Sequence, residues 1–216
     1  KKSKIPLVVH LADHSPEFQR ISSAKILRGA AKLVCITEEM KSMYERSIGR
    51  NDIEVLHNGA EQACSDIASP PHEPFNAQNP FVLCFIGSLF SNLHGDCIED
   101  IFEAVSQIRQ KFPWVEFHLY GQRQPADFLE DLIRRDGFTH HGIVMPLEKK
   151  FEIMEKAHCF VIPSSFKEEK NRHYRYSFPT KLPELIASGR PILSYGPRET
   201  ATNRILETNN LGLRIH

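Results

Sequence analysis

The sequence predicts an α/β fold: a doubly wound parallel sheet preceded by a smaller α/β segment. Short apolar runs of strand length alternate with longer segments whose apolar residues recur at helical spacing. That alternation favours parallel strands joined by crossover helices. It is most regular between residues 80 and 216, where about six strands are expected, the number typical of a doubly wound sheet.

Residues 1–58 are expected to be the end of a larger, N-terminal α/β domain. Apolar runs of strand length and one polar segment with helical spacing occur in order at 5–11, 17–28 (the polar segment), 32–36 and 53–56. Thr37, Glu38 and Glu39 indicate a helix start with acidic residues in the first turn, and Gly49 ends that helix. Three strands are too few to complete a nucleotide-type half-sheet, so we expect this segment to pack poorly alone.

Residues 59–79 are expected to link this segment to a second domain at 80–216, because 61–79 is rich in Pro, Ala and Ser. The strands expected in the second domain are 81–86, 115–120, 139–144, 159–162, 192–195 and 211–215. Its expected helices are 98–111, 126–135, 147–156, a short helix that begins near 179–180, and 199–207. The charged and aromatic segment 166–176 is expected to be a loop.

The composition excludes several classes of protein. The chain is 41% hydrophobic and carries 27 basic and 27 acidic residues, so it lacks the basic excess typical of nucleic-acid binders. No apolar run approaches the roughly 18 residues that a membrane span needs, and we find no signal-peptide pattern. The five cysteines form no CxxC pair, and three of them lie in apolar runs. We therefore expect a reducing, cytoplasmic environment and no zinc site.

The segment from Ser177 to Leu193, SFPTKLPELIASGRPIL, has a pattern that suits an anion site. Pro179 and Pro183 fix the start of a short helix near Pro179–Thr180, because proline is tolerated only in a first helical turn. Gly189 is expected to end this helix and lead into a buried strand.

The start of that short helix supplies the polar groups. The free amides of Thr180, Lys181 and Leu182, together with the Lys181 charge, suit a phosphate or diphosphate. Glu184, one turn further on, could accept hydrogen bonds from an attached ribose. The alternative is an ordinary capped core helix.

PTKLPELIASGRPIL also resembles the donor-binding motif of nucleotide-sugar glycosyltransferases with two Rossmann-like domains (the GT-B fold), of the retaining family 4, or group 1, type. That motif has two glutamates separated by seven residues. Glu184 matches the second, whereas Tyr176 stands where the first would be, as in a variant subset that reads Pro-Thr-Lys-x-x-Glu. Residues 30–61 resemble the segment that closes the N-terminal domain and crosses to the C-terminal one, so most of the acceptor-binding domain is expected to be missing from this chain.

The resemblance implies a donor site at the carboxyl ends of the strands. Ser88 and His94 stand where the family has an Arg and a Lys for the diphosphate, and Gly142 and Val144 would contact the nucleobase through the main chain. The full set of expected donor-binding residues is Gly87, Ser88, His94, Arg123, Gly142, Val144, Thr180, Lys181, Leu182 and Glu184. For the Gly87 turn and for Arg123, an ordinary tight turn and a lone surface arginine remain the alternatives.

Three residues are expected near the reacting sugar. Tyr176 replaces the first glutamate, and Glu168 (or Glu169) in the polar loop could stand in for it, although a solvated loop is the alternative. The resemblance places His10 on the acceptor-facing side of the cleft. No metal is expected at His10, Asp13 and His14, because the retaining members that the sequence resembles need none.

The resemblance implies an enzyme (EC 2.4, hexosyltransferase-like) that moves a sugar with retention from a nucleotide diphosphate sugar, such as a UDP- or GDP-sugar, to a saccharide, lipid or other acceptor in glycan or polysaccharide biosynthesis. It implies no cofactor, no nucleic-acid partner, and a cytoplasmic location with peripheral attachment to the inner membrane face through the missing domain. The fragment alone is expected to be inactive. The alternatives are a non-catalytic nucleotide-sugar-binding or assembly module and, more remotely, a flavodoxin-like regulatory domain.

Overall fold

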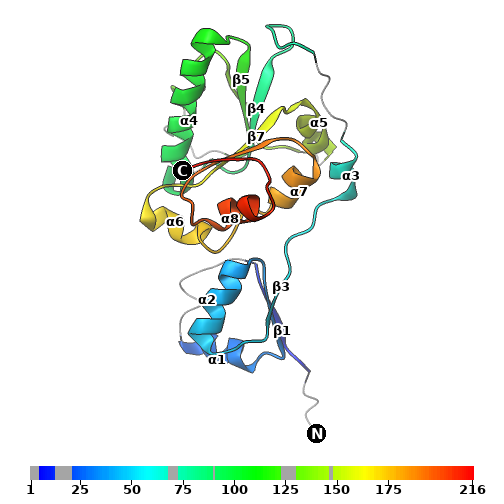
Figure 1. The fold of residues 1–216 in the computed structure, drawn as a ribbon, viewed down its shortest axis with the longest axis vertical. Helices are drawn as coiled ribbons and strands as arrows, with labels where there is room; N and C mark the ends of the chain where they lie inside the picture. The colour runs from blue at the N-terminus through cyan, green and yellow to red at the C-terminus, as the bar shows by residue number, and fades with distance from the viewer. Residues whose placement is uncertain (1–4, 13–20, 68–72, 90, 123–129, 146–147) are drawn as a thin grey trace.

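The computed structural model describes residues 5–12, 21–67, 73–89, 91–122, 130–145 and 148–216 (Figure 1). Within these residues the strands form two parallel sheets, one of three strands in the order β1-β2-β3 and one of six in the order β6-β5-β4-β7-β8-β9. The six-stranded parallel sheet confirms the predicted α/β fold. Figure 1 shows the small sheet at the N-terminal end of an elongated molecule and the large sheet at the other end.

The small sheet consists of β1 (Val8–Leu11), β2 (Lys32–Cys35) and β3 (Ile53–Val55), with α1 (Ile21–Gly29) and α2 (Glu38–Ile48) packed against it. The helix α2 begins where the sequence predicts. Thr37 is its N-cap and accepts a hydrogen bond from the Met40 amide at 3.0 Å, which satisfies one free donor of the first turn. Gly49 ends the helix with φ 70°, a conformation that costs glycine little.

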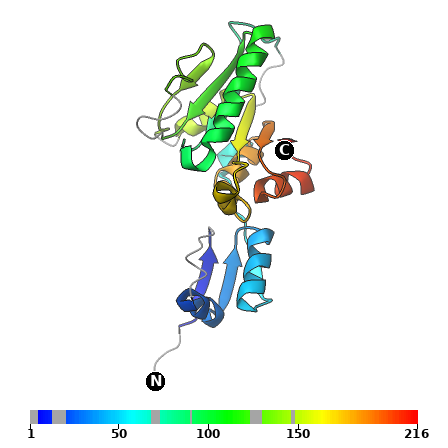
Figure 2. The same ribbon diagram turned by 90° about the vertical axis from the view of Figure 1, so that its left-hand side faces the viewer.

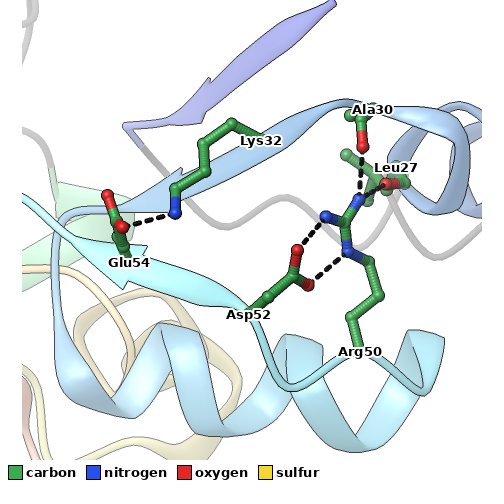
Figure 3. A network of polar contacts seen from close by, with 6 residues as sticks. All are labelled: Leu27, Ala30, Lys32, Arg50, Asp52 and Glu54. Atoms are coloured by element: carbon green, nitrogen blue, oxygen red, sulfur yellow. Dashed lines mark hydrogen bonds and ion pairs between the residues drawn. The ribbon is translucent and has the colours of Figure 1, made fainter.

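Arg50 ties the small sheet to the end of α1. Its guanidinium donates to both carboxylate oxygens of Asp52, at 2.7 and 2.5 Å, and to the carbonyls of Leu27 and Ala30, at 3.1 and 2.6 Å (Figure 3). A planar fork of five N–H donors suits this arrangement, whereas a single ammonium could not serve all four oxygens in the same geometry. Lys32 and Glu54 add an ion pair between β2 and β3.

The large sheet has apolar layers on both faces. Its strands are β4 (Phe81–Ile86), β5 (Val115–Tyr120), β6 (Phe138–His140), β7 (Cys159–Pro163), β8 (Ile192–Tyr195) and β9 (Leu213–Ile215). The helix α4 (Ser91–Lys111) packs on one face with Leu83 and Phe85 of β4. The helices α5 (Glu148–Lys156), α7 (Leu182–Ala187) and α8 (Ala201–Thr208) pack on the other face, with Cys84 of the same strand. The side chains of β4 therefore alternate between the two layers.

Several predicted segments differ from the structure. The expected loop 166–176 contains α6 (Glu168–Tyr174), whose two acidic residues in the first turn favour a helix that charge density alone does not predict. The expected linker contains α3 (Gln62–Ser65), and its Cys64 is fully buried in the layer formed by α5, α7 and α8. The helix α4 begins at Ser91, seven residues before the predicted start. Of the expected helix 126–135, residues 130–135 form turns and the rest lies outside the described residues.

The two sheets meet through α2 on one side and the segment from α6 to α8 on the other. The Thr37 hydroxyl donates to the carbonyl of Tyr176 at 2.5 Å, and Arg204 of α8 lies 3.6 Å from Glu39 of α2. Figure 2 shows the arrowheads of β1 and β2 directed toward α6 and α8. The carboxyl ends of the small sheet thus face the large domain.

Candidate functional site

The carboxyl ends of the large sheet are joined by tight backbone turns. The Gly87 amide donates a hydrogen bond to the carbonyl of Tyr120 at 2.8 Å, and the Gly121 amide donates one to the carbonyl of Gly142 at 2.7 Å. At Gly121 φ is 148°, and a Cβ there would lie 1.7 Å from the Gly87 carbonyl oxygen. Gly87 and Gly142, both expected at the donor site, therefore both lie next to Gly121. Backbone packing already accounts for the glycine at position 121.

The other expected residues near these turns are less closely connected. Ser88 is exposed directly after β4, Val144 is half-buried after β6, and His94 belongs to α4. Arg123 lies outside the described residues. Ser88 and Val144 therefore lie at the carboxyl edge of the sheet, and within the described residues neither side chain makes a hydrogen bond or ion pair.

The short helix α7 begins later than predicted. Its first residue is Leu182, with Lys181 as N-cap and Pro183 in the first turn, so the proline argument holds but the start lies two to three residues further on. The Leu182 amide, expected to be free for a phosphate, donates to the carbonyl of Pro179 at 2.9 Å. That expectation is wrong, because the turn before the helix uses this donor. The amides of Thr180 and Lys181 have no acceptor within the described residues.

Glu184 is held by a lysine that no motif predicts. The Lys150 ammonium, in the first turn of α5, lies 2.8 Å from Glu184 and 3.0 Å from Glu61. The Lys150 side chain is 9% exposed and that of Glu184 17%. Burial works against the charged form of Lys150, but its hydrogen bonds to the two carboxylates outweigh this and raise its pKa. A carboxylate can accept about four hydrogen bonds, so Glu184 keeps capacity for a further donor.

Lys181 lies beside this pair. Its side chain is half-buried, and within the described residues its ammonium makes no hydrogen bond or ion pair. Burial lowers the pKa of Lys181, Glu184 opposes that change, and the charge of Lys150 adds to it. A desolvated ammonium without a counterion favours an anionic ligand, because such a ligand would restore the lost stabilisation of the charge.

The three residues expected near the reacting sugar are dispersed. Tyr176 lies where the two domains meet and packs against the core of the small sheet. Glu168 is exposed in the first turn of α6, and His10 is exposed on β1. Neither makes a hydrogen bond or ion pair with the described residues, so the structure does not bring His10 and Glu168 together with Tyr176 through direct contacts.

A second polar cluster anchors α6, and sequence reasoning missed it. Ser165, fully buried after β7, donates to Asp96 of α4 at 2.7 Å and accepts from the Lys167 amide at 3.1 Å. Lys170 of α6 lies 3.6 Å from the same aspartate. These contacts fix the start of α6 against α4. The spacing in sequence gives no indication of them, because Ser165 and Asp96 are 69 positions apart.

Two further findings concern ligands and membranes. Within the described residues, no group of three or more His, Cys, Asp or Glu side chains could hold a metal ion. In the same part of the chain, none of the helices combines the length and apolar character required to cross a bilayer.

Comparison with models of known protein families identifies the family of this chain. The sequence model of the family Glycosyl transferases group 1 matches residues 80–213, more than half of the chain. The chain belongs to the group 1 glycosyltransferase family. This confirms the resemblance found in PTKLPELIASGRPIL, and the matched residues are the six-stranded domain that carries Lys181 and Glu184. No curated protein matches the sequence.

Solved structures show the same fold for this group 1 glycosyltransferase. WaaG, a glycosyltransferase involved in lipopolysaccharide biosynthesis, matches 98% of this chain with 16% identity and a TM-score of 0.66, over 62% of its own length. TarM matches 97% of the chain with 16% identity and a TM-score of 0.63, over 39% of its length. The pneumococcal O-GlcNAc transferase GtfA, solved in complex with UDP and GlcNAc, matches 88% with 16% identity and a TM-score of 0.60, over 37% of its length. The chain thus spans less than two thirds of each of these proteins.

Proposed function

We propose that this glycosyltransferase chain binds a nucleotide diphosphate sugar at the carboxyl edge of its large sheet and, with an acceptor domain, transfers the sugar with retention to a glycan or lipid-linked acceptor. The observation that carries the donor assignment is Lys181, a half-buried ammonium without a partner in the described residues, next to Glu184. The UDP complex of GtfA, a protein of the same fold, supports a nucleotide donor.

In this proposal the chain's own residues act by position and charge. Lys181 contacts the diphosphate and stabilises the negative charge that develops as the glycosidic bond to it breaks. Glu184, oriented by Lys150, accepts hydrogen bonds from the ribose hydroxyls and fixes the nucleoside relative to the acceptor. Tyr176 lies where the two sheets meet, which suits a position near the transferred sugar.

The proposed compartment is reducing. All five cysteines are free, and four of them are buried. Burial raises the pKa of both Cys35 and Cys97 to about 12, so these thiols stay protonated at neutral pH. Free buried thiols are typical of cytoplasmic proteins, which supports a reaction at the cytoplasmic side of a membrane where lipid-linked acceptors are elongated.

Calorimetric titration tests the donor site. We expect UDP or GDP to bind more tightly than the matching nucleoside. Lys181→Ala should weaken binding of the nucleoside diphosphate by about 1.5–3 kcal/mol and leave binding of the nucleoside almost unchanged, because only the diphosphate contacts that charge. Glu184→Gln should weaken binding of both ligands by similar amounts. Lys149→Ala, an exposed charge on the neighbouring α5, is the matched control. An equal loss of affinity for both ligands in Lys181→Ala, or unchanged affinities in both the Lys181 and Glu184 variants, would contradict the assignment.

A non-catalytic nucleotide-sugar-binding module is the second candidate. Tyr176 occupies the position of the first motif glutamate, and its carbonyl is used to join the two sheets. Incubation of the full-length gene product with labelled donors and extracted glycolipid distinguishes the two functions. Donor hydrolysis or transfer supports the enzyme, whereas tight donor binding without turnover supports the module.

A further inference from the structure

An arginine-rich pocket lies between the two sheets, apart from the donor residues. It has a volume of about 340 Å³ and is formed by α2, the connection between α6 and α7, and α8. Besides Tyr176, its lining consists of Glu38, Glu39, Ser42, Arg46, Arg175 and Arg204. It shares no residue with the Lys150–Glu184–Lys181 group on α5 and α7.

The carboxylates that line the pocket have cations of their own. Glu38 lies 3.9 Å from Lys41, and Glu39 lies 3.6 Å from Arg204. The side chains of Arg46 and Arg175 make no hydrogen bond or ion pair within the described part of the chain. The pocket therefore presents two guanidinium groups that have no counterion among the described residues, one from each sheet domain.

The spacing on α2 directs polar groups to this pocket. Glu38, Ser42 and Arg46 are four residues apart in turn, so they lie along one face of the helix. The Ser42 hydroxyl lines the pocket between a paired carboxylate and an unpaired guanidinium. Guanidinium groups bind carboxylate and phosphate oxygens in a bidentate manner, which a hydroxyl donor can supplement.

We propose that this pocket binds an oxyanion carried by the acceptor, a phosphate ester or a carboxylate, through Arg46 and Arg175. The inference rests on the proposed glycosyltransferase function and adds a substrate class to it. An acceptor anion fits better than the donor diphosphate, because four of the seven lining residues come from α2, which packs on the small sheet that the resemblance assigns to the acceptor side. Tyr176, at the pocket wall, connects this pocket to the expected position of the transferred sugar.

Binding of two simple probes to the full chain tests the proposal. Calorimetry or NMR titration with glycerol phosphate and with glucuronate, at low ionic strength, separates a phosphate from a carboxylate acceptor. We expect at least one probe to bind, to lose about tenfold or more of its affinity in Arg46→Gln and in Arg175→Gln, and to bind more weakly as salt rises. Preference for either probe supports the site and identifies its anion.

The controls separate this site from the donor site. Arg134→Gln removes an exposed guanidinium on another surface, with a side chain 72% exposed, and should leave both probes unaffected. UDP and GDP affinities should stay unchanged in Arg46→Gln and Arg175→Gln, and thermal melts should match the wild type, since both side chains are exposed. Failure of both probes to bind, an equal loss of probe affinity in Arg134→Gln, or a loss of UDP and GDP affinity in the Arg175 variant would overturn the proposal. Absence of UDP and GDP binding in the wild type with intact probe binding would instead refute the donor assignment.

Discussion

The Lys150 ammonium lies 2.8 Å from the carboxylate of Glu184, and both groups are largely buried. The same ammonium reaches Glu61, which precedes α3 in the segment between the two sheets. Glu184 is the residue proposed to hold the ribose. Its orientation therefore depends on a lysine 34 positions away, in a helix that carries no recognised motif.

Lys150→Met should weaken nucleoside binding as well as stability. Methionine preserves most of the apolar stem but leaves the buried carboxylate of Glu184 without its cation, which we expect to destabilise the fold by about 1.5–3 kcal/mol. Because Glu184 loses its fixed orientation, uridine and UDP, or guanosine and GDP, should lose affinity in parallel. Urea denaturation and calorimetry measure the two effects. Lys149→Met, on the exposed side of the same turn, is the control, and an unchanged nucleoside affinity in Lys150→Met would show that the pair does not position Glu184.

Thr37→Val should destabilise the contact between the two sheets. The Thr37 hydroxyl is buried, caps α2 by accepting from Met40, and donates to the Tyr176 carbonyl. Valine keeps the shape and removes both hydrogen bonds, at a cost of about 1–2 kcal/mol. Thr37→Ser retains the hydroxyl and should remain within about 0.5 kcal/mol of the wild type. Equal stability of the valine and serine variants in urea denaturation would show that neither hydrogen bond contributes.

Phe102→Ala should be among the most damaging single changes in the large domain. Its ring is fully buried in the layer under α4 and stacks on Phe138, with centroids 4.4 Å apart. Removal leaves a cavity that the surrounding strands cannot fill, with an expected loss of about 3–5 kcal/mol. Phe112→Ala, near the end of the same helix and 39% exposed, should cost about 1 kcal/mol or less. Thermal and urea unfolding of both variants provide the comparison.

The sequence predicts well those elements whose boundaries are set by neighbouring residues in the chain. Strands β4 and β5 have the predicted limits, because the apolar run of β4 is bounded by Pro80 and Gly87, and the alternating apolar and polar residues of β5 end at Gly121. The helix α2 is equally well predicted, since Thr37 and Gly49 supply both of its caps. The sequence of the helix α6 predicts a loop, because it is almost entirely polar. Its stability comes from contacts with Asp96 and Ser165, which lie far away in the chain.

In the candidate site too, residues within a local motif are predictable from the sequence, whereas residues brought together only by folding are not. Lys181 and Glu184 were predicted from a contiguous motif, and they do lie together at the start of α7. Lys150 could not be predicted, because its charge looks like any other in the helix EKKFEIMEK, and only the folded chain places it between Glu61 and Glu184. The Arg46 and Arg175 pocket likewise requires the juxtaposition of two domains.

His158 should make the fold less stable at mildly acidic pH. Its Nδ1 accepts a hydrogen bond from the Val82 amide at 3.1 Å, which requires that nitrogen to be unprotonated. Burial, and to a smaller extent the charge of Arg190, lowers the pKa of His158 below its ordinary value of 6.5. Below about pH 6.5 the unfolded chain therefore binds a proton at this histidine that the folded chain does not, so stability is complete above that pH and falls as pH decreases toward the lowered pKa.

Burial also lowers the pKa of His141, so the test is a comparison between variants. His158→Asn keeps an acceptor and cannot titrate, so its loss of stability between pH 7.5 and 5.5 in urea denaturation should be smaller than that of the wild type. His216→Asn, which changes an exposed histidine, should follow the wild type, and an identical pH dependence for all three proteins would show that His158 makes no contribution.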